Sequence, residues 1–344
     1  MKAAIIGATG YGGAELIRIL HQHPEVQIAS IHSTSRQGNP AYASYPHLQD
    51  VLCLDFDDIA TEHIMGTADV VFTATPSGVS SKLIPGLMKT DAKVIDLSGD
   101  FRIKNPESYE MWYKKPASDP QLVNDAVYGL SEWYQADIQQ ARLVANPGCY
   151  ATAALLGLAP LIQKGWVDPA SVIIDAKSGV SGAGRTQSAV AHFPEMNDNF
   201  KIYKVNQHQH IPEIEQVLSR WGGQMPPITF STHLVPMTRG IMATIYANVA
   251  KETSLKQLYE LYHQVYDNNY FVRLREHNFP GTKEVYGSNF CDIALAFDER
   301  TNRITIVSVI DNIMKGASGQ AVQNMNIMFG LCEKTGLEFL PVYP

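Results

Sequence analysis

The sequence predicts an α/β protein with a parallel sheet in its first half and a largely antiparallel sheet in its second. Up to residue 148, short apolar runs alternate with helical patterns, the order that builds parallel sheets from βαβ units. A glycine-rich turn follows the first of these runs. After residue 149, apolar runs follow one another with short breaks, which favours antiparallel pairing. We therefore predict a Rossmann-type first domain and an α+β second domain.

The length and charge of the chain limit its partners. The sequence has 344 residues, a net charge of −7 and four cysteines. The length suggests about two domains, and the mild acidity gives no reason to expect nucleic acid or anionic membrane as a partner. The cysteine spacings match neither a disulfide scaffold nor a zinc site, so we expect a cytoplasmic protein without a metal. We expect no secretory signal and no membrane span, because no apolar run approaches the roughly 20 residues that a span needs.

A glycine-rich turn over residues 7–13 follows the first predicted strand, residues 2–6, and precedes a helical pattern over 14–20. Strand, turn and helix in this order form a dinucleotide loop, although the spacing here is G-x-x-G-x-x-G. A merely structural turn is the alternative. In the dinucleotide-loop interpretation, the glycines allow the tight turn, the approach of the pyrophosphate and close helix–strand packing. The predicted cofactor-binding residues of this turn are Gly7, Thr9, Gly10, Tyr11, Gly12 and Gly13.

The second predicted strand, residues 26–31, indicates which dinucleotide binds. An NAD enzyme would carry Asp or Glu at the end of this strand to hold the ribose 2′-hydroxyl. Here the strand leads instead to Ser33, Ser35 and Arg36. Because a guanidinium suits a 2′-phosphate, we predict NADP(H) as the cofactor. The alternative is that Arg36 is a solvated loop charge.

Two further strands, residues 68–74 and 93–97, place polar loops at the same sheet edge. The first leads to Thr75 and Pro76, which are predicted to line the cofactor crevice, and then to a helix over 79–88. The second leads to Arg102, whose planar fork suits a substrate phosphate or carboxylate. A salt bridge between Arg102 and Asp100 or another acid is the alternative.

A cysteine motif occupies the middle of the chain. Residues 105–132 are expected to form a covering loop or short helices, and a strand over 141–145 follows. The motif Asn-Pro-Gly-Cys-Tyr-Ala-Thr over 146–152 then precedes a helical pattern over 153–161. Because the proline and glycine force a tight turn, Cys149 is expected at a helix N-terminus, which favours the nucleophilic thiolate. The alternative is a buried cysteine that packs as a small hydrophobe.

A second glycine-rich loop follows the predicted strand over 171–177. Residues 178–185 combine glycines, serines and an arginine, so the loop is predicted to hold an anion, with a mobile turn as the alternative. Ser178 and Gly179 are assigned to cofactor binding, and Ser178, Ser181 and Arg185 to substrate binding.

Two histidines precede a predicted helix that runs to about residue 221. His208 and His210 lie two residues apart, which is a poor zinc signature without nearby cysteine or aspartate ligands. A general acid/base role for one of them is more plausible. We assign it to His210, with His208 binding substrate or exchanging that role, and with Glu213 orienting the histidine.

The remaining patterns predict strands over 228–235, 241–249 and 270–275, a helix over 254–267, and a hairpin of 292–297 with 303–309. We expect these strands to pair in sequence order. Asn312 and Lys315 are expected near the nicotinamide, and a helical pattern over 322–331 ends the chain. The predicted domains are 1–148, completed by a C-terminal helix over 316–344, and 149–315.

Taken together, the motifs of this chain resemble those of the N-acetyl-gamma-glutamyl-phosphate reductases, arginine-biosynthetic relatives of aspartate-semialdehyde dehydrogenase. The resemblance spans the chain and rests on six segments, residues 7–13, 96–102, 146–152, 177–185, 208–213 and 315–321, of which the cysteine motif is the most specific. It implies NADP, a catalytic cysteine at Cys149 and a homo-oligomer, either a dimer or a tetramer.

The implied chemistry is the reduction of an acyl phosphate through a cysteine thioester, in a phosphorylating aldehyde dehydrogenase type of enzyme. A sister reductase that acts on aspartyl or aminoadipyl phosphate is the nearest alternative, because substrate length is not evident from these residues. A non-catalytic NADP-sensing protein is an alternative of another class. A dehydrogenase of the glyceraldehyde-phosphate type shares the thioester chemistry, but the missing acid after the second strand argues against it.

Overall fold

The chain forms two compact units in the computed structural model, which describes residues 1–59, 64 and 66–343. The first unit contains residues 1–148 and 317–338, and the second contains 149–316 and the residues from 339 onward. The chain therefore passes into the second unit between Gly148 and Cys149 and leaves it between Gly316 and Ala317. Residue 344, the last of the predicted C-terminal segment, lies outside the described residues.

The first unit is built on a parallel sheet that has seven strands within the described ranges, as the alternating apolar and helical patterns predicted. In spatial order the strands are β3 (Phe56–Asp57), β2 (Gln27–His32), β1 (Lys2–Ile6), β4 (Val70–Thr73), β5 (Lys93–Asp96), β7 (Leu143–Ala145) and β6 (Val127–Tyr128). Ala3 to Ile6, Val70 to Phe72, and Val94 and Ile95 are almost completely buried, as expected for strands covered on both faces.

The strand order reverses at β1, which pairs with β2 on one side and β4 on the other. In sheets of this kind, ligands bind outside the carboxyl ends of the strands at such a switch point. The two loops at this point are in contact, because a Cβ atom on Gly7 would lie 2.3 Å from the Ala74 carbonyl oxygen. Gly7 also has a φ of +84°, which favours glycine.

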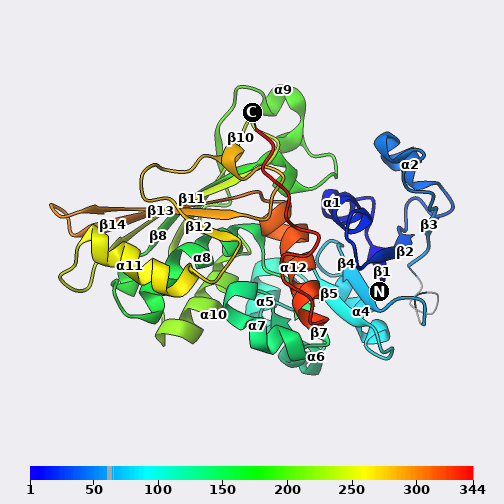
Figure 1. Cartoon of the computed structure of the whole chain (residues 1–344), viewed down its shortest axis with the longest axis horizontal. Helices are drawn as coiled ribbons and strands as arrows, with labels where there is room; N and C mark the ends of the chain where they lie inside the picture. The colour runs from blue at the N-terminus through cyan, green and yellow to red at the C-terminus, as the bar shows by residue number, and fades with distance from the viewer. Residues whose placement is uncertain (60–63, 65, 344) are drawn as a thin grey trace. The chain divides into compact units, whose positions relative to one another are not determined.

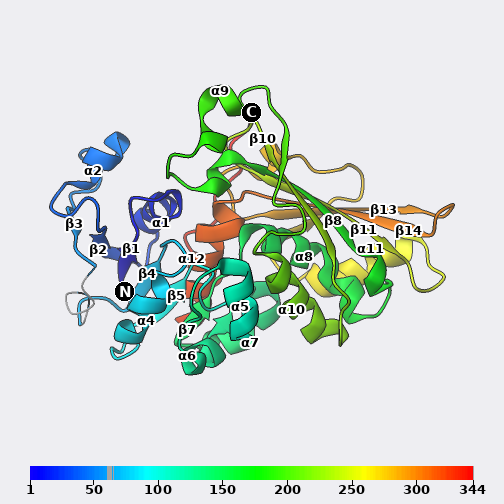
Figure 2. The same ribbon diagram turned by 180° about the vertical axis from the view of Figure 1, so that it is seen from behind.

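The helices of the first unit are α1 (Tyr11–His21), α2 (Ala41–Ser44), α4 (Ser80–Leu87), α5 (Pro106–Tyr113), α6 (Pro120–Asp125), α7 (Ser131–Gln140) and α12 (Gly319–Met328) (Figures 1 and 2). The aromatic region 105–132 thus forms the short helices that were one of its two predicted forms. Short 3-10 helices cover Pro46–Leu48 here and Pro169–Ser171, Val180–Ala183, Ala189–Ala191 and Thr282–Glu284 in the second unit.

The C-terminal helix is shorter than the predicted range of 316–344. A π-helical turn, Met314–Ser318, leads into α12, and α12 ends at Met328. Gly330 follows with a φ of +70°, the left-handed conformation that commonly terminates helices. Within the first unit, the amides of Gln320 and Asn324 both donate to the Gly129 carbonyl, at 3.0 and 2.8 Å, and anchor α12.

The second unit contains a mixed sheet, also of seven strands in the part of the chain that is described. In spatial order these are β12 (Val272–Leu274), β13 (Cys291–Asp298), β14 (Arg303–Ile310), β11 (Ile241–Asn248), β8 (Ile173–Gly179), β10 (Thr229–Val235) and β9 (Lys201–Tyr203). The β8–β10 and β12–β13 pairs are parallel and the other pairs are antiparallel. The predicted largely antiparallel sheet and the β13–β14 hairpin are confirmed.

Pairing in sequence order was wrong for β10 and β11, because both pair with β8, one on each side of it. The connection over residues 236–240 passes around the end of β8. It does so through backbone bonds from Gly179, Val180 and Ser181 to the carbonyls of residues 240, 237 and 238. A five-residue connection that begins with proline has the length to make this crossing, which a two-residue hairpin turn lacks.

Three helices cover one face of the second sheet: α8 (Cys149–Gln163), α10 (Ile211–Gly222) and α11 (Leu255–Tyr266), with the short α9 (Phe193–Met196) elsewhere (Figures 1 and 2). Of α8, every residue from Tyr150 to Ile162 is buried, so it forms the centre of this unit. Among the helices that the structure describes, none has the length and apolar character of a membrane span.

A proline inside α8 leaves one buried carbonyl to be satisfied from outside the helix. Pro160 has no N–H to donate to the carbonyl of Leu156, four residues earlier. The hydroxyl of Tyr266, from α11, donates to that carbonyl at 2.5 Å. Tyr262, one turn earlier in α11, donates to the adjacent carbonyl of Gly157. The α8–α11 contact therefore depends on hydroxyl groups as well as on apolar packing.

We predict that Tyr266→Phe lowers the free energy of unfolding by about 1–3 kcal/mol, because it leaves the buried Leu156 carbonyl without this donor. In a Pro160→Ala background the restored N–H can satisfy the same carbonyl, so the cost of Tyr266→Phe should fall. A double-mutant cycle by urea denaturation measures this coupling. Strictly additive effects of the two substitutions would contradict the assignment.

Candidate active site

The turn after β1 is shaped for a close ligand. Gly10 is the N-cap of α1 and offers no side chain, so the first backbone N–H groups of the helix face outward without a side-chain cap. A Cβ atom on Gly13 would lie 2.5 Å from the Cα of Ala8, which explains the third glycine by close packing. Tyr11 is 39% exposed beside this turn. The arrangement suits an anion at the helix N-terminus.

A line of hydroxyl groups leads away from this turn. Thr9 Oγ1 lies 3.4 Å from Ser33 Oγ, and Ser33 Oγ lies 3.3 Å from Ser35 Oγ. Tyr45 donates to the carbonyls of Thr9 and Gly10, at 2.8 and 3.1 Å, and so supports the turn. The next residue after these serines, Arg36, is exposed. Hydroxyls followed by an exposed guanidinium suit a phosphorylated ribose.

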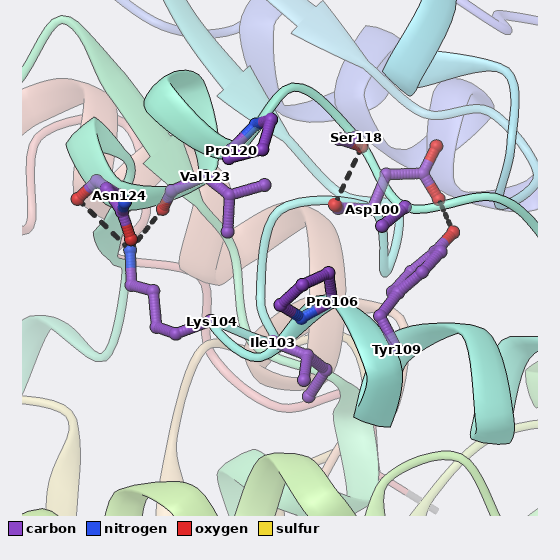
Figure 3. A pocket seen from close by; sticks show the side chains of 10 residues that line it. Asp100, Ile103, Lys104, Pro106, Tyr109, Ser118, Pro120, Val123 and Asn124 are labelled. Carbon is purple, nitrogen blue, oxygen red and sulfur yellow. Dashed lines mark hydrogen bonds between the residues drawn. The ribbon is translucent and has the colours of Figure 1, made fainter.

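The loop after β5 is fixed by Asp100. Its carboxylate accepts from the backbone N–H groups of Gly78 and Ser81 at 2.8 and 2.9 Å, at the start of α4, and from the Tyr109 hydroxyl at 2.7 Å. The Ser118 hydroxyl donates to the Asp100 carbonyl (Figure 3). In the neighbouring loop after β4, Thr75 Oγ1 lies 2.9 Å from Ser80 Oγ, and Pro76 follows.

A cavity of about 140 Å³ lies beside Asp100 and Tyr109 (Figure 3). Its lysine, Lys104, donates to the carbonyls of Val123, Asn124 and Ala126, at the end of α6. The acid and the lysine of this cavity are therefore engaged by the protein itself, and the cavity serves to support the loop.

The buried Arg102 was predicted to hold a substrate phosphate or carboxylate. Its Nε donates to the Asn146 carbonyl at 2.7 Å, and its Nη2 donates to the Leu97 carbonyl at 2.8 Å. The side chain thus ties the loop after β5 to the start of the cysteine motif. Contact with substrate stays a prediction for Arg102.

Cys149 is the first residue of α8 and is partly buried. The chain reaches it from the end of β7 through Asn146, Pro147 and Gly148. Asn146 is fully buried, accepts from the Asn324 amide at 3.0 Å and donates to the Ala317 carbonyl at 3.0 Å. Of the other cysteines, Cys291 is buried in the second sheet, and Cys53 and Cys332 are exposed. The thiol of Cys149 alone stands at the start of a long helix among these four.

Both predicted histidines contact the ring of Tyr150, the residue after Cys149. The ring centroids of Tyr150 and His208 are 5.2 Å apart, and those of Tyr150 and His210 are 6.0 Å apart, with edge-on orientations. The His208 and His210 rings are 4.7 Å from each other. Helix α10 begins at Ile211, directly after His210, and Pro212 in its first turn favours a helix start at this point. The structure therefore brings both histidines to the N-terminal end of α8.

Both histidines are buried, and the surroundings of His208 determine its protonation. His208 is 5% exposed, and burial, reinforced by His210 and Lys204, lowers its pKa to about 2. Its Nδ1 accepts from the backbone N–H of His210 at 3.1 Å. His208 is therefore neutral at ordinary pH and carries its proton on Nε2. Glu213, in the first turn of α10, is fully buried.

A pair of tyrosines supports this cluster. The hydroxyls of Tyr150 and Tyr203 lie 3.1 Å apart, and Tyr150 also donates to the His233 carbonyl at 3.3 Å. Burial raises the pKa of Tyr203 to about 12 and raises that of Tyr150 still further. Both phenols are therefore neutral at ordinary pH and act as hydrogen-bonding groups.

The predicted anion loop begins at the end of β8. Ser178 and Ser181 are buried, and Arg185 is exposed. The Ser178 hydroxyl donates to the Gly179 carbonyl at 2.9 Å. Because the N–H groups of residues 179–181 bond to the 237–240 connection, they are not available as a backbone cradle. An anion bound by these three residues would depend on their side chains.

Asn312 and Lys315, predicted near the nicotinamide, are buried residues of the second unit. The Asn312 amide donates to Ser181 Oγ at 3.0 Å and accepts from the Gly240 N–H at 2.8 Å. The Lys315 ammonium lies 5.6 Å from the centre of the Phe271 ring. Within the described residues there is no cluster of three or more histidine, cysteine, aspartate or glutamate side chains suited to a metal.

Sequence reasoning did not single out Tyr150, Tyr203 or Asn146 as parts of the site. Tyr150 and Asn146 stand inside the cysteine motif, so their position was the available signal. Tyr203 reaches the cluster through the pairing of β9 with β10, which local sequence does not reveal.

Comparison with known proteins agrees with this architecture. A family profile described as "Semialdehyde dehydrogenase, NAD binding domain" matches residues 2–141. A second, "Semialdehyde dehydrogenase, dimerisation domain", matches residues 149–312. The fold is similar to aspartate semialdehyde dehydrogenase II complexed with ASA from Vibrio cholerae, with a TM-score of 0.71 and 17% identity over 96% of this chain and 98% of that one. It is also similar to aspartate semialdehyde dehydrogenase with NADP from Candida albicans, with a TM-score of 0.67 and 15% identity over 95% and 98% of the two chains.

Curated relatives are much closer in sequence. A protein of Bacillus cytotoxicus named N-acetyl-gamma-glutamyl-phosphate reductase is 60% identical over the full length of both chains. One of the same name from Bacillus mycoides is 59% identical, again over the full length of both. With these identities and both profile matches, the chain belongs to the N-acetyl-gamma-glutamyl-phosphate reductases of the semialdehyde dehydrogenase family.

Proposed function

We propose that this chain catalyses the NADPH-dependent reduction of N-acetyl-gamma-glutamyl phosphate to N-acetylglutamate semialdehyde and phosphate, a step of arginine biosynthesis. The observation that carries the proposal is the placement of Cys149 at the N-terminus of α8, beside a tyrosine that contacts both histidines, in a chain 60% identical to a reductase of that name. An acyl phosphate needs a nucleophile, a proton donor and a reductant, and the chain offers residues for each.

NADPH fits the residues of the first unit. The glycine turn would hold the pyrophosphate at the start of α1, and Ser33, Ser35 and Arg36 would hold the 2′-phosphate. Thr75 and Pro76 would line the same switch point. When bound, the cofactor supplies the hydride that reduces the thioester.

Cys149 performs the covalent step. Its thiolate, favoured by the helix N-terminus, attacks the acyl carbonyl carbon, a C–S bond forms, and the C–O bond to phosphate breaks. After reduction the carbonyl oxygen carries the negative charge, and it takes a proton before the thiohemiacetal collapses. Collapse breaks the C–S bond, releases the aldehyde and restores the thiolate.

His210 is the proposed acid/base, because His208 is held neutral by burial and its Nδ1 accepts from the backbone of His210. His210 would protonate the oxygen of the reduced intermediate and take the proton back as the aldehyde forms. His208 would position His210 and, through Nε2–H, donate a hydrogen bond to substrate. Glu213 would orient the pair from the first turn of α10.

Arg102, Ser178, Ser181 and Arg185 are the proposed contacts for the substrate and its departing phosphate. Ser178, Gly179, Asn312 and Lys315 are proposed to support the nicotinamide end of the cofactor. Self-association is assigned to residues 149–312, which match a dimerisation domain, and a homodimer or homotetramer is proposed.

The reverse reaction tests the proposal. NADP reduction with N-acetylglutamate semialdehyde should require added phosphate, because phosphate must displace the thiolate from the thioester. Cys149→Ser should lower turnover by at least about 10⁴-fold, since the hydroxyl is a far weaker nucleophile, and should keep NADPH binding. Turnover without phosphate, or turnover only with a shorter or longer acyl phosphate in the forward assay, would refute the proposed reaction.

Two measurements should distinguish the roles of His208 and His210. His210→Asn should lower kcat by about 10²–10⁴-fold. His208→Asn should lower kcat by a smaller factor than His210→Asn does. His208 has its own signature in stability. In the unfolded chain it takes up a proton near its ordinary pKa of 6.5, but in the folded chain it stays neutral down to about pH 2.

Because the unfolded state then binds more protons, the contribution of His208 to stability is full above pH 6.5 and declines below it, by up to about 1.4 kcal/mol per pH unit. Between pH 6.5 and 4, His208→Asn should therefore lose less stability than the wild type, as measured by urea denaturation at each pH. Equal slopes for the two proteins would contradict a buried neutral His208.

Arg36 should determine cofactor preference. Arg36→Ala removes the proposed partner of the 2′-phosphate, so KM for NADPH should rise by about tenfold or more while KM for NADH changes little. Lys89, a lysine of the same unit outside the proposed site, supplies the control variant Lys89→Ala. Parallel changes in both KM values for Arg36→Ala would argue that the guanidinium is a solvated loop charge.

A further inference from the structure

The backbone of Gly316 lies directly against the proposed nucleophile. A Cβ atom on Gly316 would be 2.7 Å from the Cβ of Cys149 and 3.2 Å from its Cα. Real Cβ atoms essentially never lie closer than 3.0 Å to another atom of this kind, so a side chain at this position would displace Cys149 or the segment itself. Position 316 has no positive φ. Glycine is therefore needed here for close approach and not for its backbone conformation.

The segment that carries Gly316 is tied down on its N-terminal side by Asp311. This carboxylate is fully buried and accepts from the N–H groups of Ile313 and Met314 at 2.8 and 3.1 Å. Its other oxygen accepts from the Gly287 N–H at 2.8 Å and lies 3.6 Å from the Arg239 guanidinium. The Gly316 N–H itself donates to the Asp311 carbonyl at 3.0 Å.

The segment is tied down on its C-terminal side as well. Asn146, three residues before the nucleophile, donates to the carbonyl of Ala317. The other end of the same amide accepts from Asn324 in α12. Two residues of the cysteine motif therefore contact successive residues of this segment. Asn146 donates a hydrogen bond to Ala317, and Cys149 packs against Gly316.

The segment that carries Gly316 forms a π-helical turn, Met314–Ser318, directly before α12 begins. Single π turns are rare and occur frequently at functional sites. Just before this turn is complete, the Gly316 N–H donates to the carbonyl of Asp311, five residues earlier in the chain. The turn thus presents the one residue without a side chain to Cys149.

We propose that Gly316 is a positioning residue for the Cys149 thiol: the tethered π turn places bare backbone against the Cys149 Cα and Cβ and fixes the direction of Sγ at the start of α8. This inference rests on the proposed role of Cys149 as nucleophile. Since the turn is anchored on both sides of Gly316, a methyl group there displaces Cys149 and moves Sγ away from the helix N-terminus.

The test compares Gly316→Ala with two glycine variants in the second unit. Gly281→Ala adds a methyl group in open space, and Gly222→Ala adds one at 2.9 Å from the Ile162 side chain, at the far end of α8 from Cys149. Gly222→Ala thus reproduces crowding on the same helix without contact to the nucleophile. Melting temperatures and circular dichroism establish which variants fold.

Two readouts follow. Steady-state kinetics of Gly316→Ala should show kcat lowered by about 100-fold with KM for NADPH unchanged, since misplacement of a reacting group by about 1 Å costs that much. Iodoacetamide alkylation of Cys149, followed by mass spectrometry of its peptide, should show a rate–pH midpoint raised by about one unit. The two control variants should match the wild type in kcat within about twofold and in the alkylation midpoint.

An alkylation profile of folded Gly316→Ala that coincides with the wild type would overturn the proposal, as would a shift of equal size in Gly222→Ala. If Gly316→Ala does not fold, Asn146→Leu decides, because it keeps the size of the side chain, adds no charge near the thiol, and removes the donor to Ala317 together with the acceptor for Asn324. A raised alkylation midpoint for Asn146→Leu is expected, and an unchanged one would overturn the proposal. The alkylation readout needs no turnover, so it remains decisive even if the wild type fails the reductase assay.

Discussion

Close approach of the chain to a glycine is the constraint on which the turn after β1 and the start of α8 both depend. Gly7 allows the turn after β1 to touch the Ala74 carbonyl, and this contact closes the switch point of the first sheet. Gly316 allows the returning chain to touch Cys149 at the start of α8. Any side chain at either position would collide with atoms that the surrounding hydrogen bonds hold in place. Gly7 thus determines the shape of the proposed cofactor turn, and Gly316 determines the position of the Cys149 side chain.

Burial then decides the chemistry of the groups around that thiol. The low-dielectric surroundings of His208 keep it neutral, so it accepts a hydrogen bond from the backbone of His210. The same effect keeps Tyr150 and Tyr203 protonated. Buried polar groups of this kind must be satisfied locally. The rings and hydroxyls around α8 therefore form one hydrogen-bonded and packed cluster that holds the histidines at its N-terminal end.

Much of the fold followed from local pattern. The parallel strands of the first unit, the helix after the glycine turn and the β13–β14 hairpin all appear where apolar periodicity and turn residues predicted them. The pattern was misleading where strand order matters, because β10 and β11 are consecutive in sequence and yet flank β8. Strand order depends on which crossovers the packed helices allow, and no local propensity encodes it. The C-terminal helix was overestimated because Gly330 ends it in a left-handed conformation.

By itself, the sequence determined the residue types that the proposed chemistry requires and their order along the chain: the glycine turn, the basic residue after the second strand, the cysteine motif and the histidine pair. Those are properties of short segments, and short segments carry their own turn and helix signals. Only the tertiary structure decided that His208 is neutral and that Arg102 binds backbone carbonyls. Only the structure, too, showed that Gly316 lies against Cys149, 167 residues away in sequence. Burial, pKa and close approach arise when distant segments pack together, and a linear pattern does not contain them.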